Sequence, residues 1–386
     1  MPFFTMSLIS TLWLLLGLGR AFGQERVHGP TTFNVPISVT ESGYRTVAIS
    51  LGTPPREFNL WLDTGSDPTW VLSQSCIESC SISDANRTAY LPTESTTHND
   101  TGDTLFVDYL GGAVAGTVFI DALSIANTST GVSTRVLLAA FSTWAWLDAD
   151  GMLGLAFPRI EEPVHASLLE SLFHPEILEA HKFAIYAGQD LTPNNGVIQF
   201  GGHSTEYNST DVTYFNIQRY VNDNNAVIYW TTYIDRVDFI LNTNGSTHSN
   251  TISVEDFAVW DTGSSHITVP ETYIEDIYSS IGMNYTFIKA GGRPLCEDLR
   301  KLDFNMTLVL PEGTIAVHPA DLIIPGYTED QYCWPMFEPS SSGRWIIGMG
   351  LIRNFYTVWD LGGWDIRSDE LQQRLGFAEL KAEYHP

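Results

Sequence analysis

The feature that most constrains the fold is an internal repeat. The tetrapeptide Asp-Thr-Gly-Ser occurs at residues 63–66 and again at 261–264, each time behind an apolar run, at 58–62 and 257–260. At average residue usage, a single chance copy is expected on the order of 0.005 times in a chain of this length. An apolar-apolar-Gly element follows each copy, ending at Gly154 and Gly348. The chain therefore consists of two homologous halves, each with one loop aspartate.

The local patterns predict an all-β chain. Each copy of the repeat has the pattern of a strand that runs into a tight loop presenting one aspartate. From residue 44 onward, short apolar runs alternate with clusters of Gly, Pro, Asn, Asp and Ser. Helical patterns are few and short: we expect one surface helix region at 161–180, broken at Pro175, and another helix at 270–281. The boundary between the halves is predicted near Ser204.

These features resemble the pepsin-like aspartic proteases (peptidase family A1), and the resemblance runs from about residue 44 to about 380. It implies a bilobal fold with two pseudo-symmetric β lobes, at 24–204 and 205–386, and a cleft between them. It also implies an aspartic endopeptidase that acts on polypeptide substrates, binds pepstatin-type inhibitors, is monomeric and needs no cofactor or metal.

The chemistry of such a site explains why two aspartates suffice. Two carboxyl groups held side by side cannot both ionise easily, so their pKa values separate, as is known for aspartic proteases in general. One group then acts on water as a general base while the other keeps a proton for the scissile carbonyl. The predicted catalytic pair is Asp63 and Asp261, without an assignment of the proton to either. For a single copy, the alternative is an Asx turn that ends a strand.

The three residues after each aspartate have predicted supporting roles. The glycines let backbone approach backbone in the cleft. The resemblance implies that the threonine hydroxyls bond across to the opposite loop and that the serine hydroxyls donate to the aspartates. The supporting residues are Thr64, Gly65, Ser66, Thr262, Gly263 and Ser264.

A β-hairpin with a glycine-containing tip is predicted at 105–119. It resembles the family's flap, a hairpin that closes over substrate. Tyr109 matches the flap tyrosine, and Trp70 matches the tryptophan that hydrogen-bonds to it. Relatives usually have Gly after this tyrosine, whereas this chain has Leu110 and Gly111. The polar contacts of the flap to substrate are therefore expected to differ.

The resemblance also places substrate pockets beside the dyad. One wall is expected from Trp61, Met152 and one of Trp144 or Trp146. The corresponding residues of the second half are Val259 and Ile346. Apolar walls select apolar side chains by burial. For Trp61, core packing and a pocket wall are equally compatible with the sequence.

The sequence departs from the family pattern in three places, and two of these departures are expected to change the pKa values of the aspartate pair. Asp67 adds a third acid close to the dyad and is expected to raise its pKa values. Met349 stands where many acid-active relatives carry Asp, which is expected to act in the opposite direction. The insertion at 362–371 has no functional interpretation.

The N-terminus and the cysteines indicate the secretory pathway. Residues 1–23 have the pattern of a signal peptide with cleavage before Gln24, and no other stretch is apolar and long enough to span a bilayer. We expect an extracellular or lysosomal protein. Four cysteines allow three pairings, and a metal site at Cys-x3-Cys is weakly supported. The resemblance favours Cys76 with Cys80 and Cys296 with Cys333. Seven candidate glycosylation sequons begin at Asn86, Asn99, Asn127, Asn208, Asn244, Asn284 and Asn305.

The charge distribution limits the partners. Lysine and arginine number 19 against 45 acids, a net charge of -26. Binding of nucleic acid or of an anionic membrane surface needs clustered cations and is disfavoured. Between Gln24 and Gly43 the only Lys or Arg is Arg26, so a basic pro-segment over the dyad is missing. In the family that the chain resembles, these early residues more often form an edge strand, and residues 33–39 have the alternation for that role.

Two interpretations of function remain at this level. The leading one is an aspartic endopeptidase. The alternative is a binding or inhibitor protein on the same fold that is weakly active or inactive. Such proteins typically lose an aspartate or the flap tyrosine, and this chain keeps both. A retroviral-type homodimer is excluded because both halves lie in one chain.

Overall fold

The computed structural model describes residues 31–80, 87–126, 128–157, 167–173, 177–188, 194–218, 229–243, 245–324, 331–340, 342–362 and 373–385. The predicted signal peptide, the segment from 24 to 30 and nearly all of the 362–371 insertion lie outside this range. So do the sequons at Asn86, Asn127 and Asn244.

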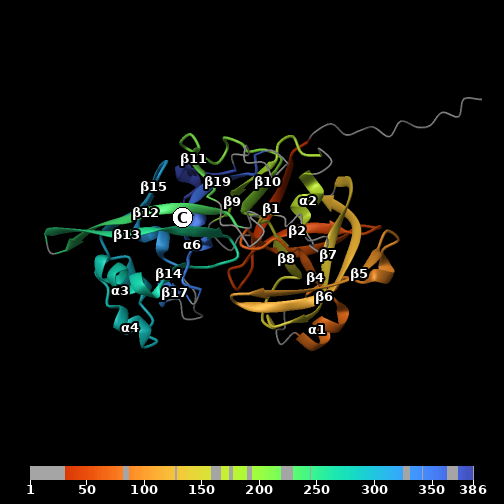
Figure 1. Cartoon of the computed structure of the whole chain (residues 1–386), viewed down its shortest axis with the longest axis horizontal. Coiled ribbons are helices and arrows are strands. Elements are labelled where there is room, and N and C mark those ends of the chain that lie inside the picture. The colour runs from red at the N-terminus through yellow and green to blue at the C-terminus, as the bar shows by residue number, and fades with distance from the viewer. Residues whose placement is uncertain are drawn as a thin grey trace, which may run out of the picture.

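The described residues form two large sheets and a few short helices (Figure 1). The strands are β1 Phe33–Val39, β2 Arg45–Leu51, β3 Arg56–Asp63, β4 Trp70–Leu72, β5 Asn99–Tyr109, β6 Gly112–Ile125, β7 Thr128–Ser142, β8 Gly151–Gly154, β9 Lys182–Tyr186, β10 Gly196–Phe200, β11 Thr213–Asn216, β12 Thr231–Thr243, β13 Ser246–Asp261, β14 Ile267–Pro270, β15 Phe304–Leu310, β16 Gly313–Val317, β17 Phe337–Ser340, β18 Trp345–Gly348, β19 Phe355–Asp360 and β20 Arg374–Glu379. The α-helices are α1 Gln74–Cys80, α2 Leu168–Phe173, α3 Glu271–Ser280, α4 Tyr285–Lys289, α5 Cys296–Leu299 and α6 Met349–Ile352, with 3-10 turns at Pro92–Glu94, Pro319–Leu322 and Ala382–Tyr384.

The repeat in the sequence corresponds to a repeat in strand pairing. β3 runs parallel to β8, which sets Asp63 opposite Gly154, and β13 runs parallel to β18, which sets Asp261 opposite Gly348. In both halves the following short strand, β4 or β14, adds to the other edge of the apolar-apolar-Gly strand in antiparallel fashion. The apolar-apolar-Gly element is therefore the strand that supports each aspartate loop.

The glycine that ends each supporting strand is required by close backbone approach. A Cβ at Gly154 would lie 2.5 Å from the carbonyl oxygen of Asp67, and one at Gly348 would lie 2.6 Å from that of Ser264. Both are below any normal contact distance for a Cβ, and the clashing atoms are backbone.

The 13-stranded sheet joins the two halves of the chain. Its order is β11-β20-β19-β9-β10-β1-β2-β3-β8-β4-β7-β6-β5, so strands from the end of the sequence pair with β9 of the first half. The 7-stranded sheet has the order β16-β15-β12-β13-β18-β14-β17. The boundary between the halves near residue 204 remains a prediction. Three strands that follow it in the sequence, β11, β19 and β20, belong to the 13-stranded sheet.

An aromatic cluster packs where the halves meet. The buried Trp230 ring lies 4.4 Å from that of Phe157 and 5.2 Å from that of Trp359, measured between centroids. Its indole N–H donates to the carbonyl of Leu155 at 2.9 Å. These contacts link the first half to the second directly behind the aspartate loops.

Two expectations need correction. Within the described part of 161–180 only α2, six residues long, is helical, whereas α3 agrees with the expected 270–281. The segment at 33–39 is a strand but not an edge strand, because β1 pairs with β10 on one side and β2 on the other. An alternating sequence pattern shows which face of a strand meets the core, but it does not show whether the strand has a hydrogen-bonded neighbour on both sides.

No helix in the described part of the chain is both long and apolar enough to cross a membrane.

Candidate active site

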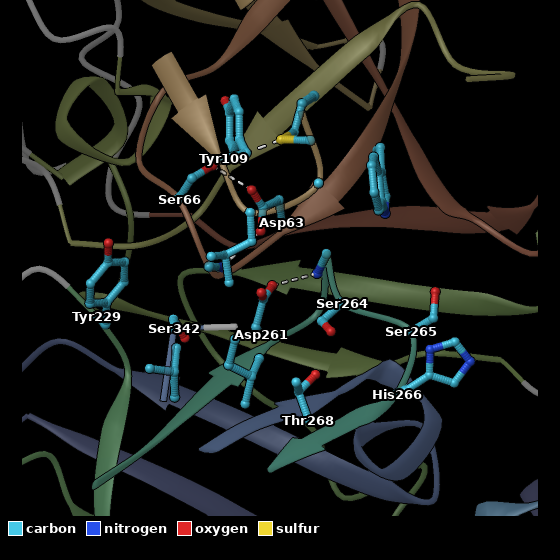
Figure 2. A pocket seen from close by; sticks show the side chains of 18 of the residues that line it. Asp63, Ser66, Tyr109, Tyr229, Asp261, Ser264, Ser265, His266, Thr268 and Ser342 are labelled. Carbon is cyan, nitrogen blue, oxygen red and sulfur yellow. Dashed lines mark hydrogen bonds between the residues drawn. The ribbon is translucent and has the colours of Figure 1, made fainter. Parts of the chain in front are cut away.

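The two aspartates end β3 and β13 and face each other across the cleft (Figure 2). The amide of Gly65 donates to Asp63 Oδ1 and that of Gly263 to Asp261 Oδ1, each at 2.8 Å. A Cβ at Gly65 would lie 2.5 Å from Asp261 Oδ1, and one at Gly263 would lie 2.5 Å from Asp63 Oδ1. Any larger residue at either position would therefore separate the carboxyl groups.

The threonines connect the loops through a reciprocal set of buried hydrogen bonds. The Thr64 hydroxyl donates to the Trp260 carbonyl at 3.0 Å and accepts from the Thr262 amide at 2.9 Å. The Thr262 hydroxyl likewise donates to the Leu62 carbonyl at 3.0 Å and accepts from the Thr64 amide at 2.9 Å. Each loop thus supplies the partners that the other loop's backbone needs.

The two serines do not behave alike. The Ser66 hydroxyl donates to Asp63 Oδ2 and also contacts Met152 Sδ at 3.8 Å. Between the described residues Ser264 and Asp261, no hydrogen bond involves the serine hydroxyl, so the expected symmetric role is absent. The Ser264 backbone N–H instead donates to the Asp261 main-chain carbonyl at 3.2 Å, and the Ser264 carbonyl accepts from the Met349 amide at 2.7 Å. The supporting α6 turn thus restrains the Ser264 backbone.

The pKa values of both aspartates are raised. Burial raises the pKa of Asp63 well above its usual range, and the neighbouring Asp261 carboxyl raises it further. Burial also raises the pKa of Asp261, opposed by hydrogen bonds from Asp63 and the Gly263 amide. Because charging both groups so close together is unfavourable, the pair retains a proton at pH values where an isolated aspartate would be ionised.

The β5–β6 hairpin lies over this pair. The Trp70 indole N–H donates to the Tyr109 hydroxyl at 3.1 Å, and Trp144 stacks on Trp70 with centroids 6.0 Å apart. Burial, followed by the field of Asp63, raises the pKa of Tyr109, so the phenol stays neutral. At the hairpin tip, Leu110 is 70% exposed, and both it and Gly111 line the cleft.

The cleft has a volume of about 670 Å³, and the expected pocket residues Trp61, Met152, Val259 and Ile346 all line it. Trp144 and Trp146 both contribute, where one was expected. Trp61 is only 8% exposed and packs edge-on against Tyr44 with centroids 4.5 Å apart. Both interpretations of Trp61 therefore apply, because a largely buried indole also presents a face to the cleft.

Other cleft residues were not identified from the sequence. Ser265 and His266 directly follow the second motif, so their proximity to Asp261 was a usable signal. Glu338 lies 77 positions after Asp261 and reaches the cleft only because β17 pairs with β14. The full set of such lining residues is Tyr44, Pro68, Val107, Asp108, Tyr229, Ser265, His266, Thr268, Glu338, Pro339, Ser340, Ser342 and Arg344.

The two departures near the dyad have different surroundings. Asp67 is buried and lines the cleft, and its charge contributes to the raised pKa of Tyr109. The largest contributions to the Asp63 pKa are burial and Asp261, so an effect of Asp67 on the dyad remains a prediction. Met349 is buried at the start of α6, where its amide bonds Ser264.

The cysteines pair as the resemblance implied. Cys76 bonds Cys80 with 4.8 Å between Cα atoms, and Cys296 bonds Cys333 with 5.0 Å. Among the described residues, no cluster of three or more His, Cys, Asp or Glu is arranged to hold a metal ion.

Four sequons lie in the described ranges. Asn99 and Asn305 are exposed on β5 and β15. Asn284 caps α4, where its side-chain oxygen accepts from the Thr286 amide at 2.9 Å. The Asn208 side-chain amide donates to the Thr210 carbonyl at 2.7 Å. Modification of these four residues remains a prediction.

Comparison with known proteins agrees with this architecture. Residues 44–370 match the family "Eukaryotic aspartyl protease". The chain is 27% identical to embryonic pepsinogen of Gallus gallus over 322 residues, covering 81% of this chain and 76% of the relative. It is 26% identical to gastricsin of Homo sapiens (86% and 80% covered) and 26% identical to cathepsin E of Mus musculus (81% and 77% covered). With two aspartate loops joined in one cleft and a family match over most of its length, the chain belongs to the eukaryotic aspartyl protease family.

Proposed function

We propose that this protein is an aspartic endopeptidase that hydrolyses peptide bonds through Asp63 and Asp261. The observation that carries the proposal is the facing pair itself. Two carboxyl groups with raised pKa values are held by reciprocal backbone bonds beneath a hairpin whose tyrosine is hydrogen-bonded in place. Family membership and relatives such as pepsin A of Gallus gallus support the same reaction class.

The proposed reaction uses the single proton that the pair retains. The ionised carboxylate removes a proton from a water molecule, whose oxygen attacks the scissile carbonyl carbon. The protonated carboxyl donates to the carbonyl oxygen and stabilises the tetrahedral intermediate. A proton then passes to the amide nitrogen, the C–N bond breaks, and a new carboxyl group and amine are released. The raised pKa values support the retention of this shared proton at pH values where an isolated aspartate would be ionised.

We further propose a preference for apolar residues at the cleavage site. Trp61, Met152, Val259 and Ile346 present apolar surface beside the dyad, with Trp144 and Trp146 extending it on the flap side. Burial of apolar surface contributes about 25 cal/mol per Å², so a substrate side chain that fills this wall gains affinity. The proposed setting is the secretory pathway, extracellular or lysosomal, and the proposed form is a monomer.

Incubation of the purified protein with denatured haemoglobin or casein from pH 3 to 7, with and without pepstatin, tests the proposal. We expect acid-dependent cleavage that pepstatin abolishes and that Asp63→Asn and Asp261→Asn lack. The alternative, a binding protein on the same fold, would bind pepstatin without cleaving either substrate at any pH. Retention of Trp70 and Tyr109 in their hydrogen-bonded geometry supports the enzyme over this alternative.

A further inference from the structure

The flap hairpin exposes a phenylalanine on the face that points away from its packed side. Leu105, Val107 and Tyr109 of β5 pack inward against the aromatic cluster beneath the hairpin. Because side chains alternate along a strand, Phe106 points to the opposite face, where it is 63% exposed. An exposed phenyl ring leaves apolar surface in water, so contact with a partner at this position is favourable.

A second exposed phenylalanine lies in the same row of the sheet. The strands β5, β6 and β7 lie side by side (Figure 1), and Phe106 is paired with Ala115, which is paired in turn with Phe141. Directly paired residues present their side chains on the same face of a sheet, and Phe141 is 48% exposed. At a strand spacing of about 4.8 Å, the two phenylalanines have backbones roughly 10 Å apart with only a methyl group between their rings. We call Phe106, Ala115 and Phe141 the outer flap patch.

The outer flap patch is continuous with the cleft. Asp108 and Leu110 follow Phe106 by two and four positions, so alternation directs them to the same face, and both also line the cleft. Leu110, at the hairpin tip, is 70% exposed. At about 3.4 Å per residue, Phe106 lies roughly 14 Å along the hairpin from Leu110. A chain that leaves the cleft beside the hairpin tip therefore reaches the patch with about four or five further residues.

The surroundings of the patch favour an extended polypeptide as its occupant. β5 is the last strand of the 13-stranded sheet, and of the described strands only β6 pairs with it, so its outer edge is open to a further strand. Strand addition uses backbone groups, which a polypeptide has and a lipid lacks. The carboxylate of Asp108 beside the patch and the net charge of -26 also oppose an anionic lipid surface. The adjoining cleft belongs to a protease family, whose ligands are polypeptides.

From this arrangement we propose that the outer flap patch is a docking surface for an extended, apolar segment of the polypeptide substrate that lies outside the cleft. The proposal rests on the proposed endopeptidase function and adds a contact remote from the scissile bond. Aromatic side chains bury a large apolar area with few rotatable bonds, which makes them effective anchors. Such a contact holds the substrate chain near the cleft, so it lowers KM for long unfolded substrates and leaves the chemical step unchanged.

The test compares a long substrate with a short one. The double variant Phe106→Thr/Phe141→Thr removes both rings and keeps β-branched side chains that suit a strand. Its kcat/KM on denatured casein should fall about tenfold through KM, whereas kcat, and both constants for an eight-residue quenched peptide, should stay within twofold of wild type. Phe287→Thr is the matched control, since Phe287 is 52% exposed on α4 in the second half, and it should leave both substrates unaffected. Equal kcat/KM on casein in the double variant and in wild type would overturn the docking surface.

Binding measurements separate this proposal from the endopeptidase function. Fluorescence anisotropy should show that labelled denatured casein binds Asp63→Asn about tenfold more tightly than the same variant with both phenylalanines replaced. If this difference were found while wild type cleaved neither substrate, the endopeptidase would be refuted and the docking surface supported.

Two other occupants of the patch are tested directly. Flotation of the protein with phosphatidylcholine vesicles, or a dimer in sedimentation velocity, would overturn the proposal if either were lost in the double variant. We expect wild type to remain unbound to vesicles and to sediment as a monomer.

Discussion

Replacement of Thr64 by valine tests whether the reciprocal threonine bonds hold the two aspartate loops together. Thr64 is completely buried, and its hydroxyl accepts from the Thr262 amide and donates to the Trp260 carbonyl. Valine keeps the branched shape and removes both bonds. Because neither backbone group has access to water, each remains without a partner.

The expected loss of stability follows from these two groups. A buried donor or acceptor that loses its partner costs about 1–3 kcal/mol, so the pair costs about 2–6 kcal/mol. With a urea m-value of about 3 kcal/mol per M for a large chain, the midpoint of unfolding should fall by roughly 0.7–2 M. Loosening of the loops should also reduce kcat/KM by about 100-fold, the effect of a shift of about 1 Å in a catalytic group.

Urea unfolding followed by tryptophan fluorescence, and hydrolysis of a quenched peptide, measure the two effects. Thr64→Ser is the matched control, since it keeps the hydroxyl and loses only a methyl group, for about 1 kcal/mol. If the serine and valine variants lost stability and activity to the same extent, the hydroxyl bonds would not be what joins the loops.

The remaining predictions concern the dyad, the flap and activation. Asp63→Asn and Asp261→Asn should each abolish peptide cleavage and retain the wild-type circular dichroism spectrum, and residual activity within tenfold of wild type would contradict the dyad. Because the folded-state pKa of Asp63 is raised, wild type should lose stability relative to Asp63→Asn as the pH rises through that pKa, which thermal unfolding at acidic and neutral pH measures. Trp70→Phe, which removes the 3.1 Å bond to Tyr109, should lower kcat/KM about two- to tenfold, and an unchanged value would show that the bond does not position the flap. The protein should be active once the predicted signal peptide is removed, without further processing, because β1 pairs on both sides within the large sheet. A lag in activity that tracks the loss of residues 24 to about 40, as followed by N-terminal sequencing, would contradict this.

The sequence alone determined the two-fold plan of the protein. Two copies of a four-residue motif, each with its own supporting strand, predict two similar halves because a strand and its tight loop are local structures. The glycines of the motif were interpretable for the same reason, since they permit a backbone approach that no other residue allows. The hairpin of Tyr109 was also visible, as two alternating strands around a glycine-containing tip.

Only the tertiary structure decided how distant segments combine. The sequence of β1 alternates as in a strand with one buried face, but it does not show how many neighbours the strand has. In the structure β1 has two neighbours, which come from residues 45–51 and 196–200. The two serines of the repeat occupy the same place in the motif but make different contacts. The backbone of Ser264 is restrained by Met349 at the start of α6, 85 positions away. Glu338 meets His266 for the same reason: long-range strand pairing, which local sequence patterns do not encode, places their side chains in one wall of the cleft.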